Sequence, residues 1–558
     1  MATISPAPFP ESGHRKLSAR EAMQRAKAAA CTVPKDNTPT CSGQVFVGLF
    51  FDGTGNNLDA DYVEPRTVEE RKHSNVVRLF HTFRDERKKG YFRHYIPGVG
   101  TKFPQIGDDN TYLFKKNRGA IGGERGEARI IWGLLQLLNS PHIYVTGAHL
   151  ILGDAAANIA NTLASSGSPA AQRRMALRTW QDKLAAALKD RKPAVEQINV
   201  SVFGFSRGAA EARVFVNWLF EVCKQEGGGW TFAGIPIRLQ FLGIFDTVAS
   251  VGLANLSDSG TLAGHQGWAD NTLEINPAVE RCVHFVAGHE VRACFPLDSV
   301  RVKSDYPANA IEVMYPGAHS DVGGGYAPRA LGVSPAPDAF MSIIPGKRMY
   351  EEAIDAGVPL KEWEHQLEDR FRKDLTPSAA AIADFNAYIQ AAKIGAGPVE
   401  DLGRKHMAYY FSYRFKHRNA FFQRPPYTTT STKDQVYLRS TQNCFIRRLS
   451  SLTPALDPGK PHSVRDQVAL STDFDPVKSA ELHEKMLKAA GLPPSFSEQH
   501  AIRVAKRIDT GSVTAEMDVF FDRYIHDSMA GFIDMGMDEY QMNSIGILKF
   551  RTVFKGND

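Results

Sequence analysis

The sequence has few cysteines and no hydrophobic run long enough to cross a membrane. Six cysteines among 558 residues form no Cys-x-x-Cys pair, which excludes a disulfide-rich framework. Cys31 and Cys41 flank a proline-rich loop, where a disulfide and two free thiols are equally compatible with the sequence. No apolar stretch reaches about 18 residues, so we expect no transmembrane helix.

The first 13 residues contain no basic segment followed by an apolar core. We therefore expect no secretory signal peptide, and a protein that is made soluble in the cytosol and would need another export route. Charge of one sign is also scarce, because 66 Lys and Arg face 61 Asp and Glu, for a net charge of +5. This balance argues against a nucleic-acid partner. With 43% hydrophobic and 23% charged residues, the composition is that of a globular protein.

Short apolar strands alternate with helical stretches through the middle of the chain. Strands are expected over residues 45–51, 199–205, 237–245 and 311–315. This alternation predicts a mostly parallel sheet flanked by helices, as in an α/β-hydrolase.

Changes in the pattern of apolar, proline and helix-forming residues along the chain predict three regions. Residues 1–42 are predicted to be an appendage with a short helix, which Ser18 and Glu21 would begin as a capping box. Residues 43–360 form the predicted catalytic domain, and residues 361–558 are expected to be mainly helical, with an end that returns to the catalytic domain. Helices in this last part are predicted over 361–375, 378–394 and 476–490.

Residues 204–208, Gly-Phe-Ser-Arg-Gly, fit the pattern G-x-S-x-G. The pattern follows a predicted strand and precedes a predicted helix, which is the context of a nucleophile elbow. A serine hydroxyl attacks an ester only when a sharp turn exposes it beside a base. Ser206 is therefore the candidate nucleophile.

The acid and the base of a triad should follow the serine, each just past a strand. Asp246 and His319 meet this requirement, and loops at the carboxyl ends of parallel strands converge. The alternatives are that Asp246 caps the next segment and that His319 packs among loop glycines. His289 and His526 are rival bases, the latter in a stretch expected to be helical.

A developing oxyanion needs two aimed donors. We expect the backbone N–H of Arg207 to supply one, and that of Gly53 or Thr54 the other. Asp52 could orient this loop, cap it, or bind a cation. No Walker loop, dinucleotide fingerprint or zinc motif is present, so no cofactor or metal is expected.

Several ordered motifs together resemble the phospholipase effectors of bacterial type VI secretion. They are Phe51-Asp-Gly-Thr-Gly-Asn-Asn57, His73-Ser-Asn-Val76, Tyr95-Ile-Pro-Gly-Val-Gly-Thr101, Gly204-Phe-Ser-Arg-Gly-Ala209, Phe245-Asp-Thr247 and His319-Ser-Asp-Val-Gly-Gly-Gly-Tyr326, with Tyr524-Ile-His-Asp-Ser528 near the end. The resemblance covers about residues 44–360 and implies that Ser206, Asp246 and His319 form a triad.

The resemblance also implies an enzyme that is injected into the periplasm of a competing cell and cuts acyl chains from membrane glycerophospholipids. Such effectors travel on the secretion spike protein, directly or through an adaptor, and their producers carry an immunity protein. The residues alone leave two other possibilities open. One is a soluble carboxylesterase with the same triad, and the other is an inactive hydrolase fold that serves as a binding module.

A lipase must also meet a membrane, which favours apolar and cationic side chains on one surface. The best stretch, residues 404–424, is rich in aromatic and basic residues and has no acidic one. Its candidate membrane contacts are Tyr409, Phe411, Arg414, Phe415 and Lys416, although the same pattern describes a half-buried helix or strand. The predicted helix over 378–394 is either a lid over the acyl groove or an ordinary packed helix.

Overall fold

The fold is seen in a computed structural model, which describes residues 2–13, 18–30, 42–109, 125–164, 170–249, 273–292, 294–453, 468–531 and 548–555. Within these residues the central sheet has eight strands. Six of them are parallel and lie in the order β2 (Tyr91–Ile96), β1 (Ser42–Phe51), β3 (Ala194–Phe205), β6 (Ile235–Phe245), β7 (Cys282–Ala287) and β9 (Ala310–Tyr315). The mostly parallel sheet predicted from the sequence is thus present.

Four shorter strands extend or accompany this sheet. The antiparallel strands β4 (Lys224–Glu226) and β5 (Gly229–Phe232) continue from the start of β6. A separate parallel pair joins β8 (Leu297–Ser299) to β10 (Val553–Lys555). This pair brings the end of the described chain next to the sheet.

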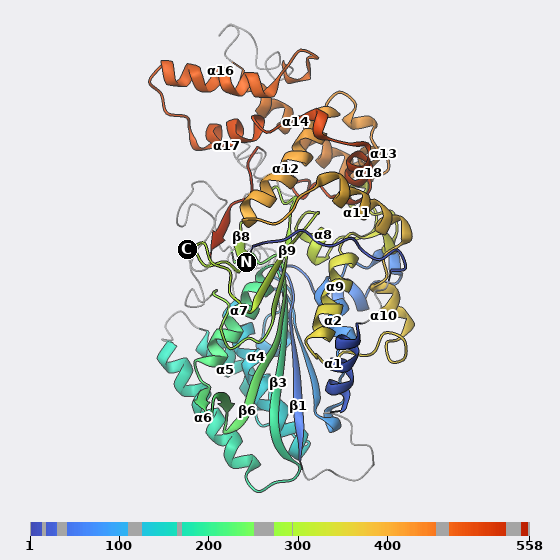
Figure 1. Ribbon diagram of the computed structural model, residues 1–558. Coiled ribbons are helices and arrows are strands. Elements are labelled where there is room, and N and C mark those ends of the chain that lie inside the picture. The colour runs from blue at the N-terminus through green and yellow to red at the C-terminus, as the bar shows by residue number, and fades with distance from the viewer. Residues whose placement is uncertain are drawn as a thin grey trace.

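The central strands are buried on both faces because helices cover each side (Figure 1). Along β1, Val47 and Leu49 pack into one apolar cluster, while Phe46 and Phe50 pack into the other. This alternation follows from the two-residue period of a strand. One face is covered by α4 (Gly126–Thr146), α5 (Gly153–Leu163), α6 (Ala170–Leu188) and α7 (Arg207–Phe220), and the other by α1 (Ala19–Ala30), α2 (Asn75–Thr82), α9 (Ile343–Asp355) and α10 (Asp369–Asp374).

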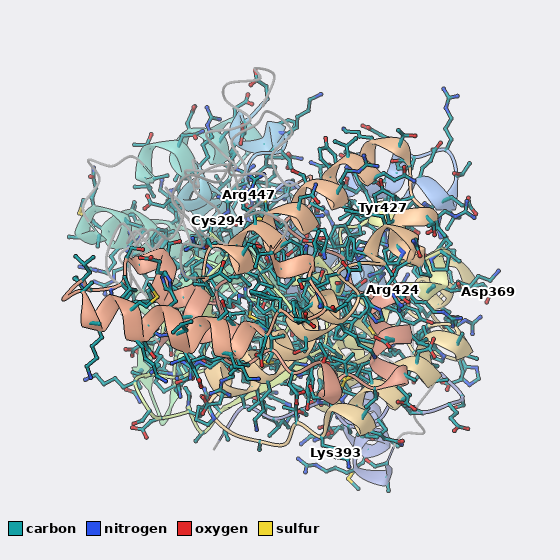
Figure 2. All side chains as sticks on the ribbon, turned by 90° about the horizontal axis from the view of Figure 1, so that it is seen from above. Cys294, Asp369, Lys393, Arg424, Tyr427 and Arg447 are labelled. Carbon is teal, nitrogen blue, oxygen red and sulfur yellow. The ribbon has the colours of Figure 1, made fainter. Side chains whose placement is uncertain are left out.

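A helical region lies above the carboxyl ends of the strands in Figure 1 and in front of the sheet in the view from above (Figure 2). It contains α11 (Ala379–Ala392), α12 (Val399–Lys416), α13 (Pro425–Thr428), α14 (Thr432–Ser450), α16 (Pro476–Ala489), α17 (Phe496–Ala505) and α18 (Ala515–Tyr524). Its buried apolar side chains are continuous with those on one face of the sheet, from Phe203 through Tyr315 to Tyr388 and Phe521. The helical region therefore shares a core with the central sheet.

Several local predictions can be compared with these elements. The capping box is confirmed, since Glu21 N–H donates to Ser18 Oγ at 3.2 Å and Ser18 N–H to Glu21 Oε2 at 2.6 Å. The helices predicted over 378–394 and 476–490 are confirmed as α11 and α16. The N-terminal residues are not detached, because Thr3 forms an isolated bridge with Gly397.

The helix predicted over residues 361–375 is wrong for its first half, because only α10 is helical there. The preceding backbone pairs with the end of α2 instead, with Lys361 N–H donating to Thr82 O at 2.7 Å and Leu360 bridging Phe83. These long-range bonds replace the bonds that a helix would make. Cys31 and Cys41 lie outside the described residues. Among the helices that are described, none is both long and apolar enough to span a bilayer.

Candidate active site

The turn that carries Ser206 joins β3 directly to α7. Ser206 has φ 58° and ψ −126°, a backbone conformation that non-glycine residues adopt rarely and at a cost in free energy. The glycines around it permit close packing, because a Cβ on Gly208 would lie 2.3 Å from the carbonyl oxygen of Asp52. A strained serine between a buried strand and a helix is the geometry of a nucleophile elbow. The turn is not on the open surface, since Ser206 is 3% exposed beneath the helical region.

Asp246 and His319 form a hydrogen-bonded pair. His319 Nδ1 lies 2.5 Å from Asp246 Oδ2, and Asp246 Oδ1 accepts the N–H of Ala287 at 2.8 Å. Asp246 follows β6 directly, and His319 is the first residue of the short helix α8 (His319–Gly323) after β9. With Nδ1 directed at the carboxylate, the other ring nitrogen, Nε2, is the one left to act on a substrate or a nucleophile.

The sheet brings this pair to Ser206. Strands β3 and β6 are neighbours in which Phe205 is opposite Phe245, and Ser206 N–H donates to Phe245 O at 3.0 Å. The imidazole of His319 packs on the ring of Phe205, the residue before Ser206, with 4.6 Å between ring centroids. The pair of His319 and Asp246 therefore lies next to the Ser206 turn, at the carboxyl edge of the sheet.

The electrostatics of the pair favour a charged carboxylate and a neutral imidazole. Burial by itself would raise the pKa of Asp246, but the charge of Arg551 and the hydrogen bond from His319 hold that pKa well below its usual range. Burial lowers the pKa of His319, and the Asp246 carboxylate only partly opposes this effect. A neutral imidazole beside an ionised carboxylate is the state that a general base requires.

The two rival histidines have other partners. His289 Nδ1 accepts the N–H of Gly317 at 2.8 Å, its Nε2 lies 3.1 Å from Tyr388 Oη, and burial holds its pKa well below the usual value. His526 Nδ1 lies 2.5 Å from Asp321 Oδ1. The expectation that His526 is helical is wrong, because α18 ends at Tyr524 and the chain continues in an irregular conformation.

The loop after β1 supplies the expected neighbours of the elbow, but only one of its two candidate donors is open. Gly53 N–H already donates to Asp52 Oδ1 at 2.7 Å. No hydrogen bond of Thr54 N–H is found within the described part of the chain, and Thr54 Oγ1 accepts from Arg207 Nε. Of the two candidates, the N–H of Thr54 is thus the one that a substrate oxygen could use.

Asp52 orients this loop through a buried carboxyl group. Besides Gly53 N–H, it accepts a hydrogen bond from Tyr95 Oη at 2.6 Å, and burial raises its pKa to about 6.

The segment that follows His319 is held by Asn75, whose Nδ2 donates to Val322 O at 2.8 Å. Across the described ranges, no group of three His, Cys, Asp or Glu residues could hold a metal ion.

Burial contradicts three of the five membrane contacts predicted on residues 409–416, whereas the Lys416 side chain is 31% exposed. Phe411, Arg414 and Phe415 are at most 4% exposed on α12, and Tyr409 is half-buried. Arg414 Nη1 lies 3.1 Å from Asp527, and Lys416 Nζ lies 2.7 Å from Asp518. The aromatic and basic pattern therefore belongs to a packed helix whose cations pair with α18 and the segment after it.

Two charged residues of the site were missed in the sequence. Arg551 donates to both carboxylate oxygens of Asp246 at 2.8 Å, although the two residues are 305 positions apart. Glu290 Oε2 accepts the N–H of His319 at 3.2 Å, and Glu290 Oε1 accepts the hydroxyl of Ser528 at 2.9 Å. No local sequence pattern points to Arg551. Ser528, by contrast, ends the motif at residues 524–528, to which the sequence analysis assigned no function.

The family model described as "T6SS, Phospholipase effector Tle1-like, catalytic domain" matches residues 47–233 and 223–352, which together make up more than half of the chain. No curated protein matches.

Two solved structures are similar to this chain. A crystal structure of an uncharacterized protein from Pseudomonas aeruginosa is 24% identical, with a TM-score of 0.75 over 100% of this chain and 85% of that one, which shows a shared fold. A structure of the Tle1 effector bound to the VgrG spike of the type 6 secretion system is 21% identical over 59% of this chain and 57% of that one. Its TM-score of 0.27 is too low to support a structural comparison. On the family match, the chain belongs to the Tle1-like phospholipase effectors of type VI secretion and contains their catalytic domain.

Proposed function

We propose that the chain is a serine hydrolase that cuts acyl esters of membrane glycerophospholipids, an activity of the phospholipase A1 or A2 type, with Ser206, His319 and Asp246 as its triad. The observation that carries the proposal is the buried pair of His319 and Asp246, which packs against the residue before a strained serine. Membership of the phospholipase effector family supports the substrate class.

The proposed reaction begins with a proton transfer. Nε2 of His319 takes the proton of Ser206 as Oγ forms a bond to the ester carbonyl carbon, and Asp246 stabilises the imidazolium. The carbonyl oxygen, now an oxyanion, accepts hydrogen bonds from the N–H groups of Arg207 and Thr54. When the intermediate collapses, the ester C–O bond breaks, and His319 gives its proton to the leaving lysophospholipid alkoxide.

The second half of the reaction uses water. His319 removes a proton from a water molecule whose oxygen attacks the acyl-Ser206 ester. The bond to Oγ then breaks, Ser206 regains a proton from His319, and a fatty acid is released. The proposed chemistry consumes one water per ester and uses no cofactor.

The test is fatty-acid release from vesicles of phosphatidylethanolamine and phosphatidylglycerol, measured for the wild type, Ser206→Ala and His319→Ala. Release by the wild type and loss in both variants is the expected result, with the same rate in the presence of a chelator. A wild type that is silent on vesicles but cleaves a short dispersed ester would be a carboxylesterase. A wild type no faster than Ser206→Ala on either substrate would be an inactive binding module.

We further propose that the protein is delivered by the type VI system, on the spike or an adaptor, into the periplasm of a target cell, and that an immunity protein protects the producer. Family membership supports the route. Expression with an added export signal should inhibit growth of a susceptible bacterium, whereas Ser206→Ala should not. Growth inhibition by both forms would show that toxicity is independent of hydrolysis.

A further inference from the structure

Arg551, near the end of the described chain, makes a two-pronged contact with the carboxylate of Asp246. Nη1 donates to Oδ1 and Nη2 to Oδ2, each at 2.8 Å. The guanidinium is held in turn by Phe295 O, which accepts from Nε at 2.7 Å. The Arg551 side chain is 6% exposed, so water competes little for these bonds. A planar arginine paired with both oxygens of a carboxylate fixes its rotation as well as its position.

The orientation that Arg551 fixes is the one that His319 uses. Oδ1 of Asp246 also accepts from Ala287 N–H, while Oδ2 lies 2.5 Å from His319 Nδ1. Oδ1 is thus held by Ala287 of β7 and by Arg551, and Oδ2 by His319 of α8 and by Arg551. We propose that Arg551 is a positioning residue of the hydrolase site, which locks the Asp246 carboxylate so that Oδ2 faces His319. The inference rests on the triad of the proposed function.

The backbone around Arg551 is anchored to β8, which lies outside the central sheet. Directly after it, β10 pairs in parallel with β8, and Leu297 N–H donates to Thr552 O at 2.9 Å. Just before β8, the ring of Phe295 packs edge-on against His319, with 5.0 Å between ring centroids. The same short segment therefore holds Arg551 by its backbone and touches the base of the triad. Arg551 lies outside the region matched by the catalytic-domain family, which ends at residue 352.

The positive charge of Arg551 has a consequence for pH that a purely mechanical brace would lack. Burial would raise the pKa of Asp246, and the charge of Arg551 is the strongest influence that lowers it. His319 already faces the Asp246 and Glu290 carboxylates, which favour its protonation, and the Arg292 cation, which opposes it. The cation of Arg551 beside Asp246 adds to that opposition, because like charges repel. Removing Arg551 should therefore raise the pKa of His319. Since His319 must be neutral to accept a proton, the acid limb of the rate profile should move to higher pH.

The experiment compares Arg551→Gln and Arg551→Lys with the wild-type protein and with a matched control. Arg301→Gln is that control, because the Arg301 side chain is likewise 6% exposed and pairs with Glu400 at 2.6 Å, with no contact to Asp246 among the described residues. Rates are measured on a short soluble ester and as labelling of Ser206 by a fluorophosphonate probe, across pH 5 to 9. Thermal unfolding of each variant is followed in parallel.

For Arg551→Gln we expect kcat to fall about 10- to 100-fold, the range for losing a hydrogen-bonded charge partner, with KM little changed. The acid limb of its rate profile should move to higher pH by about one pH unit. Arg551→Lys should return the limb to its wild-type position but restore only part of kcat, because lysine keeps the positive charge and cannot contact both carboxylate oxygens as the guanidinium does. Arg301→Gln should lower the unfolding temperature without moving the limb.

An unchanged acid limb in folded Arg551→Gln would overturn the proposal, as would an equal shift in Arg301→Gln. The probe separates this failure from failure of the phospholipase proposal. If the wild type labels at Ser206 but releases no fatty acid from vesicles, the lipid substrate is wrong and the role of Arg551 is still measured by labelling. If Ser206 does not label in the wild type, the triad itself is wrong, and the role of Arg551 falls with it.

Discussion

The ring of Phe205 lies under the imidazole of His319, with 4.6 Å between their centroids and 31° between their planes. Because Phe205 precedes Ser206, this contact joins the base to the nucleophile without passing through Asp246. The space for it is left by Gly323, at the end of the helix that His319 begins. A Cβ at Gly323 would lie 1.9 Å from the Phe205 ring.

Gly323→Ala should therefore push the Phe205 ring out of place and lower activity. We expect kcat to fall by about 10-fold or more, since small misplacements of catalytic groups are costly. The double variant Gly323→Ala/Phe205→Leu should recover part of the loss, because leucine vacates the space that the new methyl group needs. The wild type, Gly323→Ala, Phe205→Leu and the double variant are compared by ester hydrolysis and thermal unfolding. Additive losses in the double variant would contradict the role given to this contact.

The identity of the base can be tested with matched substitutions. His319→Gln should lower kcat by about 10³-fold or more, since it removes the proton acceptor of the triad. His526→Gln should cost less than about 10-fold, because its Nδ1 is engaged by Asp321 and not by Asp246. The measurement is the rate on a short ester at pH 8 for both folded variants. A larger loss in His526→Gln than in His319→Gln would make His526 the base.

Glu211 should make the protein less stable as the pH rises. It lies on α7 at 1% exposure, neither carboxyl oxygen has a hydrogen-bond partner within the described ranges, and burial raises its pKa from 4.5 to about 8 against the opposing charges of Arg129 and Arg207. A raised folded-state pKa gives stability that is complete below pH 4.5 and is lost as the pH rises through about 8.

Glu211→Gln, which cannot ionise, should gain stability over the wild type by up to about 2 kcal/mol between pH 6 and pH 7.5. Urea unfolding at these two pH values measures the difference in the free energy of unfolding. A difference between variant and wild type that stays constant with pH, or one that favours the wild type at pH 7.5, would disprove an uncharged Glu211.

The packed state of α12 predicts that its aromatic residues serve stability. Phe411 is 1% exposed and stacks on Phe445, with 6.2 Å between ring centroids. Phe411→Ala should cost about 3–5 kcal/mol of unfolding free energy, as a large-to-small change in a core does. Vesicle binding by the variant, measured below its unfolding transition, should equal that of the wild type. Normal stability with lost vesicle binding would restore the membrane-contact hypothesis for this helix.

Much of the catalytic sheet could be read from the sequence because its signals are local. The apolar strand that ends at Phe51 and the Gly-Phe-Ser-Arg-Gly turn can each be recognised from a few consecutive residues. The order of Ser206, Asp246 and His319 along the chain, each after a strand, was enough to predict that they lie at the same edge of the sheet. The membrane-contact prediction failed because it relied on residue composition, whereas tertiary packing determines whether such a stretch is exposed or buried. The aromatic and basic stretch before Lys416 is compatible with a surface or a core, and only its neighbours make it a core.

The sheet, the sharp serine turn and the family all follow from the amino-acid sequence, since alternating burial, glycines at tight contacts and ordered motifs are properties of short segments. Contacts between distant segments set which histidine pairs with Asp246, which loop N–H is open to a substrate, and the position of Arg551 beside Asp246. These outcomes depend on hydrogen bonds between segments as far as 305 residues apart. These bonds depend on how the helical region packs on the sheet and on how β10 pairs with β8. No local sequence pattern encodes that packing.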